Sequence, residues 1–269
     1  MKTDNSSPPS AGAPADKSAA DSGTVNRVLR ILSCFAEREH WGLNDLSRAL
    51  NLPRASTHRL LNLCRPLNFV TQDDEGHYRP GLELYRLAGK LAIDMPINKI
   101  AAPILEAVRD RTDETTILTL LVRSDLKMFF SMTASPAHPM RYTIKTNQLE
   151  PLAWCATGRS LLAFLSKDEI EEVIRRHEPS PLDARPLDVA ELRRSLKKIR
   201  EDGYAVTASQ RTPDAVGVAV PFFDANGDVR GNVTLTIPDF RFKPARQKEL
   251  LPVLRAAATD LTRGLGWAR

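Results

Sequence analysis

Residues 51–64, NLPRASTHRLLNLC, carry cations and small hydroxyls at the front of one expected helix and apolar residues at its back. Arginine can approach phosphates or guanine edges, and Ser, Thr and His can donate hydrogen bonds to phosphates or bases. The candidate DNA-contacting residues on this helix are Arg54, Ser56, Thr57, His58 and Arg59. Leu60, Leu61 and Cys64 would then hold the helix to its own domain.

A second candidate site lies in the segment WCATGRSLL, which places small residues at the entry to a helix. Free backbone N–H groups and the helix dipole favour a carboxylate or another anion there. Thr234 and Thr236 are two residues apart on an expected strand, so their hydroxyls share one face and could bind a small polar ligand. Both features also have ordinary structural explanations, because ATG can be a helix cap and threonines are good strand formers.

Three expected helices position the first site. An apolar repeat predicts that the first helix buries one face, made of Val25, Val28, Leu29, Leu32 and Phe35. The segment GLNDLSRALN predicts a second, shorter helix with Asn44 as its N-cap. Pro53 stands where proline is tolerated, at the start of the third helix.

A short hairpin is expected after these helices. Residues 69–71 and 77–79 are extended runs around the turn-forming segment DDEG. A helix pair followed by a hairpin predicts a winged helix-turn-helix, in which the second helix of the pair enters the major groove. His77 and Arg79 would then meet the DNA backbone or minor groove. Two alternatives stay open: a polar helix face that is merely solvated, and a winged helix that contacts protein instead of DNA.

Mixed strands and helices are expected from Ile97 onward, which predicts an α+β fold class. Helices are predicted at 103–112, at 156–166, after the capping residues Ser166 and Asp188, and around Leu250 to Leu265. Strands are predicted at 115–122, 127–133, 141–146, 204–209, 215–223 and 233–238, the last two joined across Asn226-Gly227.

These patterns divide the chain into four parts. The expected parts are a disordered leader at 1–23, a DNA-binding domain at 24–82, a linker helix at 83–96 and a second domain at 97–269. The linker carries Leu84, Leu87 and Leu91 on one face, and Pro96 is expected to end it.

Composition excludes several classes of protein. No run approaches the roughly 20 apolar residues of a membrane span, and no signal peptide is evident, so a cytoplasmic location is expected. The net charge of +5 permits a polyanionic partner. Three scattered cysteines suggest neither disulfides nor a metal site, and we expect no cofactor. An enzyme using Cys155 as nucleophile remains an unfavoured alternative, because no histidine stands in a recognisable catalytic signature.

The chain resembles the isocitrate-lyase-regulator (IclR) family of bacterial transcription factors, in VNRVLRILSCF, GLNDLSRALNLPRASTHRLLNLC, YRPGLELYRLAGKL and stretches nearer the C-terminus. The resemblance covers nearly the whole chain from Val25. It implies a homodimer or homotetramer that reads a palindromic double-stranded DNA operator, with the linker helix taking part in dimerisation. It also implies a GAF-like second domain that binds a small organic acid as effector.

The resemblance further implies which residues line the effector pocket: Ala156, Thr157, Gly158, Thr207, Gly217, Thr234 and Thr236. Two departures from the family pattern bear on the effector. Many members carry acidic residues after GYAV and a cysteine before AAP, where this chain has Ala208, Ser209, Gln210 and Gly217. We therefore hypothesise that the missing side chain at Gly217 enlarges the pocket toward a bulkier, aromatic acid.

Overall fold

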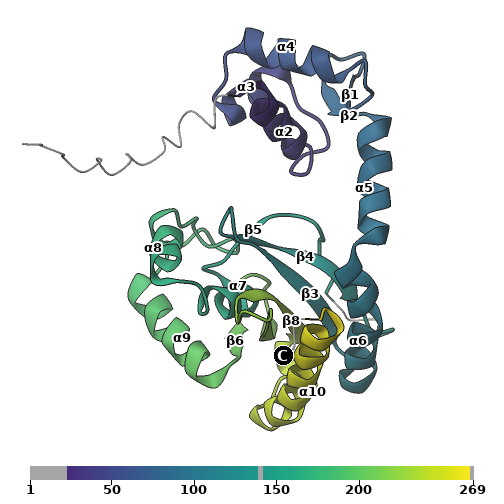
Figure 1. The fold of residues 1–269 in the computed structure, drawn as a ribbon. Coiled ribbons are helices and arrows are strands. Elements are labelled where there is room, and N and C mark those ends of the chain that lie inside the picture. The colour runs from purple at the N-terminus through teal and green to yellow at the C-terminus, as the bar shows by residue number, and fades with distance from the viewer. Residues whose placement is uncertain (1–22, 139–141, 267–269) are drawn as a thin grey trace, which may run out of the picture. The chain divides into compact units, whose positions relative to one another are not determined.

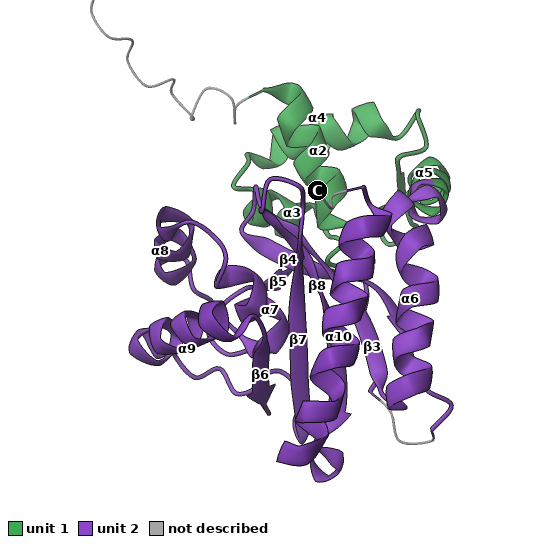
Figure 2. Cartoon of the chain, turned by 60° about the horizontal axis from the view of Figure 1, so that its bottom comes forward, with its two compact units in different colours: residues 1–90 green, residues 91–269 purple. Residues whose placement is uncertain are grey.

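The protein, described by a computed structural model, divides into two compact units, residues 1–90 and 91–269 (Figure 2). The structure describes residues 23–138 and 142–266. The predicted leader therefore lies outside the described residues, apart from Gly23. The described helices include none that is long and apolar enough to cross a bilayer.

Unit 1 has the predicted order of three helices and a hairpin (Figure 1). Its elements are α2 (Thr24–Cys34), α3 (Leu43–Leu50), α4 (Arg54–Cys64), β1 (Val70–Gln72) and β2 (Tyr78–Pro80). The two strands pair antiparallel, with Thr71 opposite Arg79. One apolar cluster joins the helices to the hairpin, with Ile31, Leu61 and Tyr78 almost fully buried in it. Helix pair and wing are therefore one packed body.

Two local predictions in unit 1 are wrong. Of the predicted face of α2, Val28, Leu32 and the C-cap Phe35 do pack in the apolar cluster. Val25 and Leu29 are instead 72% and 59% exposed, because the helix packs against the domain mainly through its C-terminal half. The N-cap of α3 is Gly42, and Asn44 lies within the first turn. The turn into α4 forms because Asn51 adopts a left-handed conformation with φ 52°, which asparagine tolerates.

The helix that follows the hairpin, α5 (Leu82–Asp94), has no buried residue. It stops before Pro96, as expected, and Pro96 begins α6 (Pro96–Thr112). Helix α6 is longer than the predicted 103–112 and passes through Pro103. Burial of Ile97, Ala101, Leu105 and Val108 on one face explains why it tolerates an internal proline.

Unit 2 is built on a six-stranded antiparallel sheet in the order β5-β4-β3-β8-β7-β6. Its strands are β3 (Thr115–Val122), β4 (Lys127–Ala134), β5 (Glu150–Pro151), β6 (Ala205–Ala208), β7 (Ala215–Phe223) and β8 (Val229–Pro238). Its further helices are α7 (Cys155–Leu162), α8 (Lys167–Arg175), α9 (Val189–Asp202) and α10 (Pro244–Gly264), with a short 3-10 turn, η1 (Asp239–Arg241). The mixed composition confirms the predicted α+β class; the GAF-like comparison stays a prediction.

Each face of this sheet is covered by different helices (Figure 2). Leu118, Val218 and Leu235 pack in the cluster that contains α6 and α10. Their strand neighbours Ile117 and Ala219 pack in the cluster of α7, α8 and α9. The period-two alternation of a strand thus gives the sheet two buried faces, as in a three-layer arrangement.

Most elements predicted in unit 2 are present, but several bounds differ; β8, for example, begins at Val229, four residues earlier than predicted. Of the strand predicted at 141–146, residue 141 lies outside the described residues and 142–146 form no strand; the outer neighbour of β4 is instead the two-residue β5. Helix α7 ends at Leu162, four residues earlier than expected. The capping box of Ser166 and Glu169 is present, and Asp188 caps α9 through the Glu191 N–H. The Asn226-Gly227 turn is also present, with Gly227 at φ 83°.

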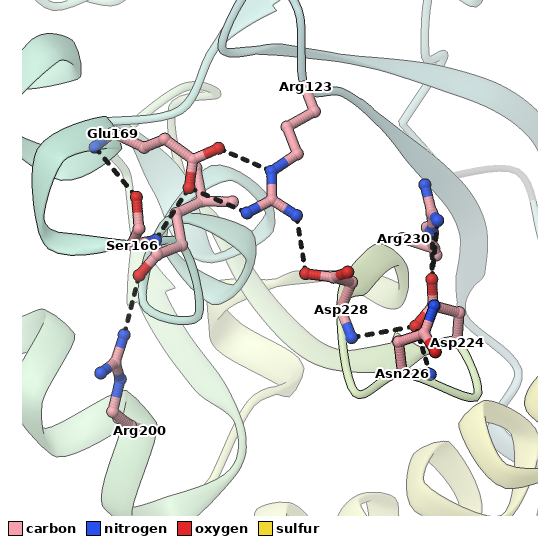
Figure 3. A network of polar contacts seen from close by, with 9 residues as sticks. Arg123, Ser166, Glu169, Arg200, Asp224, Asn226, Asp228 and Arg230 are labelled. Carbon is pink, nitrogen blue, oxygen red and sulfur yellow. Dashed lines mark hydrogen bonds and ion pairs between the residues drawn. The ribbon is translucent and has the colours of Figure 1, made fainter. Parts of the chain in front are cut away.

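Arg123, which follows β3, links the β3–β4 turn to α8 and to the β7–β8 turn (Figure 3). Its guanidinium donates to Glu169 of α8 at 2.6 Å and to Asp228 of the β7–β8 turn at 2.7 Å. The hydrogen bond from Arg123 lowers the pKa of Glu169 to about 2 against the opposing effect of burial. In the folded protein the Glu169 carboxylate therefore stays ionised until the pH falls toward about 2.

Candidate DNA-binding helix and ligand cavity

Helix α4 has one buried and one exposed face. Thr57, Leu60, Leu61 and Cys64 are buried at spacings of three and four residues, as expected for one face of a helix. The opposite face is exposed and carries Arg54, Ala55, His58, Arg59 and Asn62. The cations of the sequence motif therefore face solvent while its leucines anchor the helix.

Two features of α4 suit a polyanion. In the described part of the chain, no ion pair to a carboxylate involves Arg54 or Arg59, whereas Arg48 on α3 pairs with Asp45. The N-cap of α4 is Pro53, which supplies no side-chain cap, so the first N–H groups of the helix stay available to phosphate oxygens. Ser56, in the first turn, is partly exposed.

Thr57 is a correction to the predicted contact set. Its side chain is 0% exposed, and its hydroxyl donates to the Pro53 carbonyl at 3.3 Å. It shares the buried face with Leu60 and Leu61, so it supports the helix and does not reach the surface. The helical spacing of Thr57 from these two leucines already contained this signal.

The basic side chains of the hairpin lie beside carboxylates, unlike the arginines of α4. Arg79 Nε donates to Asp73 Oδ2 at 2.9 Å, and His77 Nδ1 lies 3.8 Å from Asp73 Oδ1 and 3.6 Å from Glu75 Oε2. Although burial opposes the shift, hydrogen bonds from the His77 N–H and from Arg79 hold the pKa of Asp73 below its usual value. The charge of Arg79 is thus partly neutralised within the hairpin.

The predicted effector residues converge on one cavity in unit 2, between the start of α7, the sheet and the β6–β7 connection. The space in it that solvent can occupy is about 40 Å³. The lining residues are Ile117, Phe130, Ile144, Cys155, Ala156, Thr157, Thr207, Gln210, Arg211, Thr212, Ala215, Gly217, Thr234 and Thr236. All predicted pocket residues except Gly158 are among them. A mixed lining of apolar groups and a few polar groups is typical of small-molecule sites.

The two predicted glycines have packing roles. A Cβ on Gly158 would lie 2.5 Å from the Leu152 carbonyl oxygen, so this glycine allows α7 to pack against the preceding segment. A Cβ on Gly217 would lie 3.3 Å from the Ala156 Cβ. Ala156 therefore limits the space that the missing side chain adds, and the hypothesis that this glycine enlarges the pocket stays a prediction.

The start of α7 is already bonded to protein oxygens. The Ala156 N–H donates to Thr207 Oγ1 at 2.7 Å, and the Cys155 N–H donates to Gln210 Oε1 at 3.1 Å. Thr207 thus lines the cavity and also caps the helix from a neighbouring strand. Two of the N–H groups that the sequence offered to an anion are used by side chains.

Cys155, which the sequence offered as a nucleophile, has an unusual backbone. Its φ of 57° lies in the left-handed region, which costs energy for a residue other than glycine. Burial raises the pKa of its thiol, so the neutral form predominates, and a neutral thiol is a poor nucleophile.

A buried amide connects two of the residues that line the cavity, Thr157 and Thr234. Asn232 Nδ2 donates to the Thr157 carbonyl at 2.8 Å and to Ser160 Oγ at 2.9 Å, and its Oδ1 accepts from the Thr234 hydroxyl at 2.9 Å. This bridge fixes α7 against β8 and orients Thr234. The strand pattern offered one signal, because Asn232 shares the face of Thr234 and Thr236.

Arg211 is the charged residue among the described lining residues that sequence reasoning missed. Its Nη2 donates to Glu150 Oε1 at 2.5 Å, and its guanidinium lies 4.7 Å from the centroid of the Phe130 ring. Its Nε is buried and has no hydrogen-bond partner among the described residues. Arg211 stands in a connection whose course is decided by distant contacts, among them the hydrogen bond from Tyr142 Oη to the Asp214 carbonyl. No group of three or more His, Cys, Asp or Glu in the described ranges could hold a metal ion.

Two family models match the chain. The IclR helix-turn-helix domain matches residues 24–74, and the bacterial transcriptional regulator IclR C-terminal domain matches residues 90–263. The chain belongs to the IclR family. Members of this family are DNA-binding transcriptional regulators, so the winged helix-turn-helix of unit 1 is its DNA-binding domain.

Relatives of the IclR-family chain span nearly its whole length. It is 24% identical to the HTH-type transcriptional regulator KipR of Bacillus subtilis, over 91% of this chain and 97% of the relative. It is also 24% identical to the transcriptional repressor IclR of Escherichia coli, over 91% of each chain.

Solved structures share the fold. A putative IclR transcriptional regulator from Silicibacter matches with a TM-score of 0.82 and 26% identity, over 91% of this chain and 97% of that one. An IclR homologue from Microbacterium hydrocarbonoxydans, solved in complex with 4-hydroxybenzoate, matches with a TM-score of 0.71 and 24% identity, over 91% and 100% of the two chains.

Proposed function

We propose that this regulator places α4 in the major groove and releases or retains its operator according to a small organic acid bound in the cavity of unit 2. The contacts on DNA come from Arg54, Ser56, His58 and Arg59, with a smaller share from His77 and Arg79. The observation that carries this proposal is the exposed face of α4, whose arginines pair with no carboxylate in the described structure. Such cations are available to phosphates and guanine edges without first breaking an ion pair.

We propose that the regulator acts as a homodimer or a homotetramer. Helix α5 buries none of its residues and leaves Leu82, Tyr85, Leu91 and Ile93 more than half exposed. Val25 and Leu29 of α2 are exposed as well. A second copy of the chain would cover apolar surface of this kind, and a twofold pair of α4 helices would read a palindromic operator.

The proposed effector is a small carboxylic acid, with an aromatic acid as one candidate. Phe130, Ile117 and Ile144 give the cavity apolar walls, and the threonines give it hydrogen-bonding groups. The 4-hydroxybenzoate held by the Microbacterium neighbour is consistent with such a ligand. An effector that binds one arrangement of the DNA-binding domains better than the other shifts the population between them, and a coupling of about 1 to 3 kcal/mol is enough for a switch.

No catalytic role is assigned to Cys155, because burial keeps its thiol neutral. The relatives are named as regulators, in agreement with a binding function. Because the proposed partner is chromosomal DNA of a bacterial cell, the protein would act in the cytoplasm.

The test is selection of bound fragments from sheared DNA of the source organism, followed by footprinting at two salt concentrations. We expect a discrete site with inverted half-sites and an affinity that falls steeply with salt, since cations on α4 release counterions from phosphates. Recovery of no preferred fragment, with or without organic acids, would contradict operator recognition and favour a winged helix that contacts protein.

A further inference from the structure

Among the described residues that line the cavity of unit 2, one buried side-chain donor has no hydrogen-bond partner. This donor is Arg211 Nε, which is buried, while Nη2 of the same guanidinium donates to Glu150. A buried charged donor without an acceptor is costly, and native proteins satisfy nearly all such groups. The described protein therefore leaves this guanidinium without its full set of acceptors.

Arg211 also decides the electrostatic character of the cavity. Among the described residues that line it, Arg211 is the one with a formal charge; the others are apolar, hydroxyl, amide or thiol groups. Glu150, which neutralises part of this charge, is not a lining residue. A ligand in the cavity thus meets a cation directly and the carboxylate of Glu150 only behind it.

At the alternative anion site, the start of α7, two of the N–H groups are already bonded to protein side chains. Thr207 Oγ1 and Gln210 Oε1 accept from the first two N–H groups of the helix. An incoming carboxylate would have to displace both side chains to bind these amides. Arg211 is itself a lining residue, so a ligand in the cavity can approach its guanidinium without displacing these capping side chains.

We propose that Arg211 is the residue that recognises the carboxylate of the effector, and that the carboxylate binds at the guanidinium and not at the start of α7. The inference rests on the ligand-sensing role proposed above. The planar guanidinium presents its N–H groups in a fork that matches a carboxylate, and stacking on Phe130 holds this plane at the cavity wall. The remainder of the ligand would lie along Ile117 and Phe130, which suits a short aliphatic or aromatic body.

The experiment is calorimetric titration of the full chain with acetate and benzoate, each compared with its uncharged amide, acetamide and benzamide. The variants are Arg211→Gln, which removes the charge, and Arg211→Lys, which keeps the charge but removes the fork. Glu150→Gln is the matched control, since it keeps an acceptor for Arg211 and removes the competing charge.

In the parent we expect at least one acid to bind about tenfold or more tightly than its amide, which is the order of a charge-assisted hydrogen bond. Arg211→Gln should reduce this preference to about threefold or less, Arg211→Lys should retain part of it, and Glu150→Gln should retain or increase it. Retention of the full preference by Arg211→Gln would overturn the proposal. The proposal would also be overturned if the parent bound acids and amides equally or bound neither acid. A loss of acid preference in Glu150→Gln as large as the loss in Arg211→Gln would overturn it too.

Operator binding separates this inference from the proposed function. Arg211→Gln should bind the selected DNA fragment as the parent does, which also shows that the variant is folded. Loss of acid preference with intact operator binding isolates the effect at Arg211. A parent chain that binds no DNA would contradict the regulator role, whatever the titrations show.

Discussion

Helix α4 of unit 1 and two buried or bridging arginines of unit 2 use positive charge in opposite ways. In unit 1, Arg54 and Arg59 stand exposed on α4 and form no ion pair in the described structure. In unit 2, Arg123 bridges two carboxylates, and Arg159, buried at 3% side-chain exposure, donates to both oxygens of Glu191. Arginines of the first kind are available to a polyanion, whereas those of the second kind link elements of the fold. The position of each charge, more than the net charge of +5, therefore indicates its role.

The largest effect is expected where a paired arginine is most deeply buried. Glu191→Ala leaves the buried guanidinium of Arg159 without its carboxylate and should lower the free energy of unfolding by about 3 kcal/mol. Arg159→Met removes the buried charge itself, and the Glu191 carboxylate that is left behind is 42% exposed and can be solvated by water. This variant should therefore lose less unfolding free energy than Glu191→Ala. Urea denaturation measures both. Equal losses in the two variants would show that the burial of Arg159 does not matter.

The second expected effect concerns DNA and not stability. Arg59→Ala should weaken operator binding by about 1 to 3 kcal/mol and reduce the salt dependence by about one counterion, while the urea midpoint stays unchanged. Arg79→Ala is the matched control and should weaken binding less, since Asp73 already neutralises part of its charge. Mobility-shift titrations at two salt concentrations measure both variants. A larger loss for Arg79→Ala would reverse the assignment of helix and wing.

A smaller effect is expected at the Arg123 bridge and depends on pH. The pKa of Glu169 is lowered to about 2 in the folded protein, below its ordinary value near 4.5, so the pair stabilises the fold above that value and loses this contribution as the pH falls toward 2. Arg123→Gln should therefore cost about 1 kcal/mol at neutral pH, a value limited by solvent screening. Urea unfolding of the parent and the variant at pH 7, 4 and 3 tests this. The difference between their free energies of unfolding should shrink as the pH falls, and a difference that stays constant would refute the prediction.

The smallest effect is expected in the cavity wall. Gly217→Ala places a methyl group 3.3 Å from the Ala156 Cβ, so α7 must move by a few tenths of an ångström. We expect a loss of stability below about 1 kcal/mol and a change of about threefold in acid binding. Thermal unfolding and titration with benzoate measure the two quantities. Tighter binding of a bulky acid by the parent than by Gly217→Ala, with no change in stability, would support the idea that this glycine enlarges the pocket.

Local patterns explain what the sequence could predict. The amphipathic repeat of α4, the β-branched runs of β3 and β8 and the capping box at Ser166 are properties of neighbouring residues, and the structure contains all of them. The error at Thr57 was avoidable, because its spacing from Leu60 and Leu61 already placed it on the buried face. Val25 and Leu29 show the opposite case. The helix was predicted correctly, but these two side chains are exposed because no other part of the domain packs against that stretch of the helix.

The candidate cavity was predictable only through the family resemblance, which named Ala156, Thr207 and Thr234 although they come from different elements. Arg211 had no such signal. Its place beside Phe130 and Glu150 depends on contacts between residues 61 to 81 positions apart, and no periodicity within its own loop reports them. The capping of α7 by Gln210 is hidden for the same reason.

The connection that carries Arg211 has a thermodynamic consequence. Its two ends, Ser209 and Asp214, both adopt left-handed φ angles, and the Asp214 carbonyl accepts from Tyr142 Oη and from the Asp239 N–H. The guanidinium is thus preorganised before an acid arrives, and little conformational entropy is lost when the acid binds. Binding free energy that is not consumed in ordering the site remains available to shift the equilibrium between the forms that hold and release DNA.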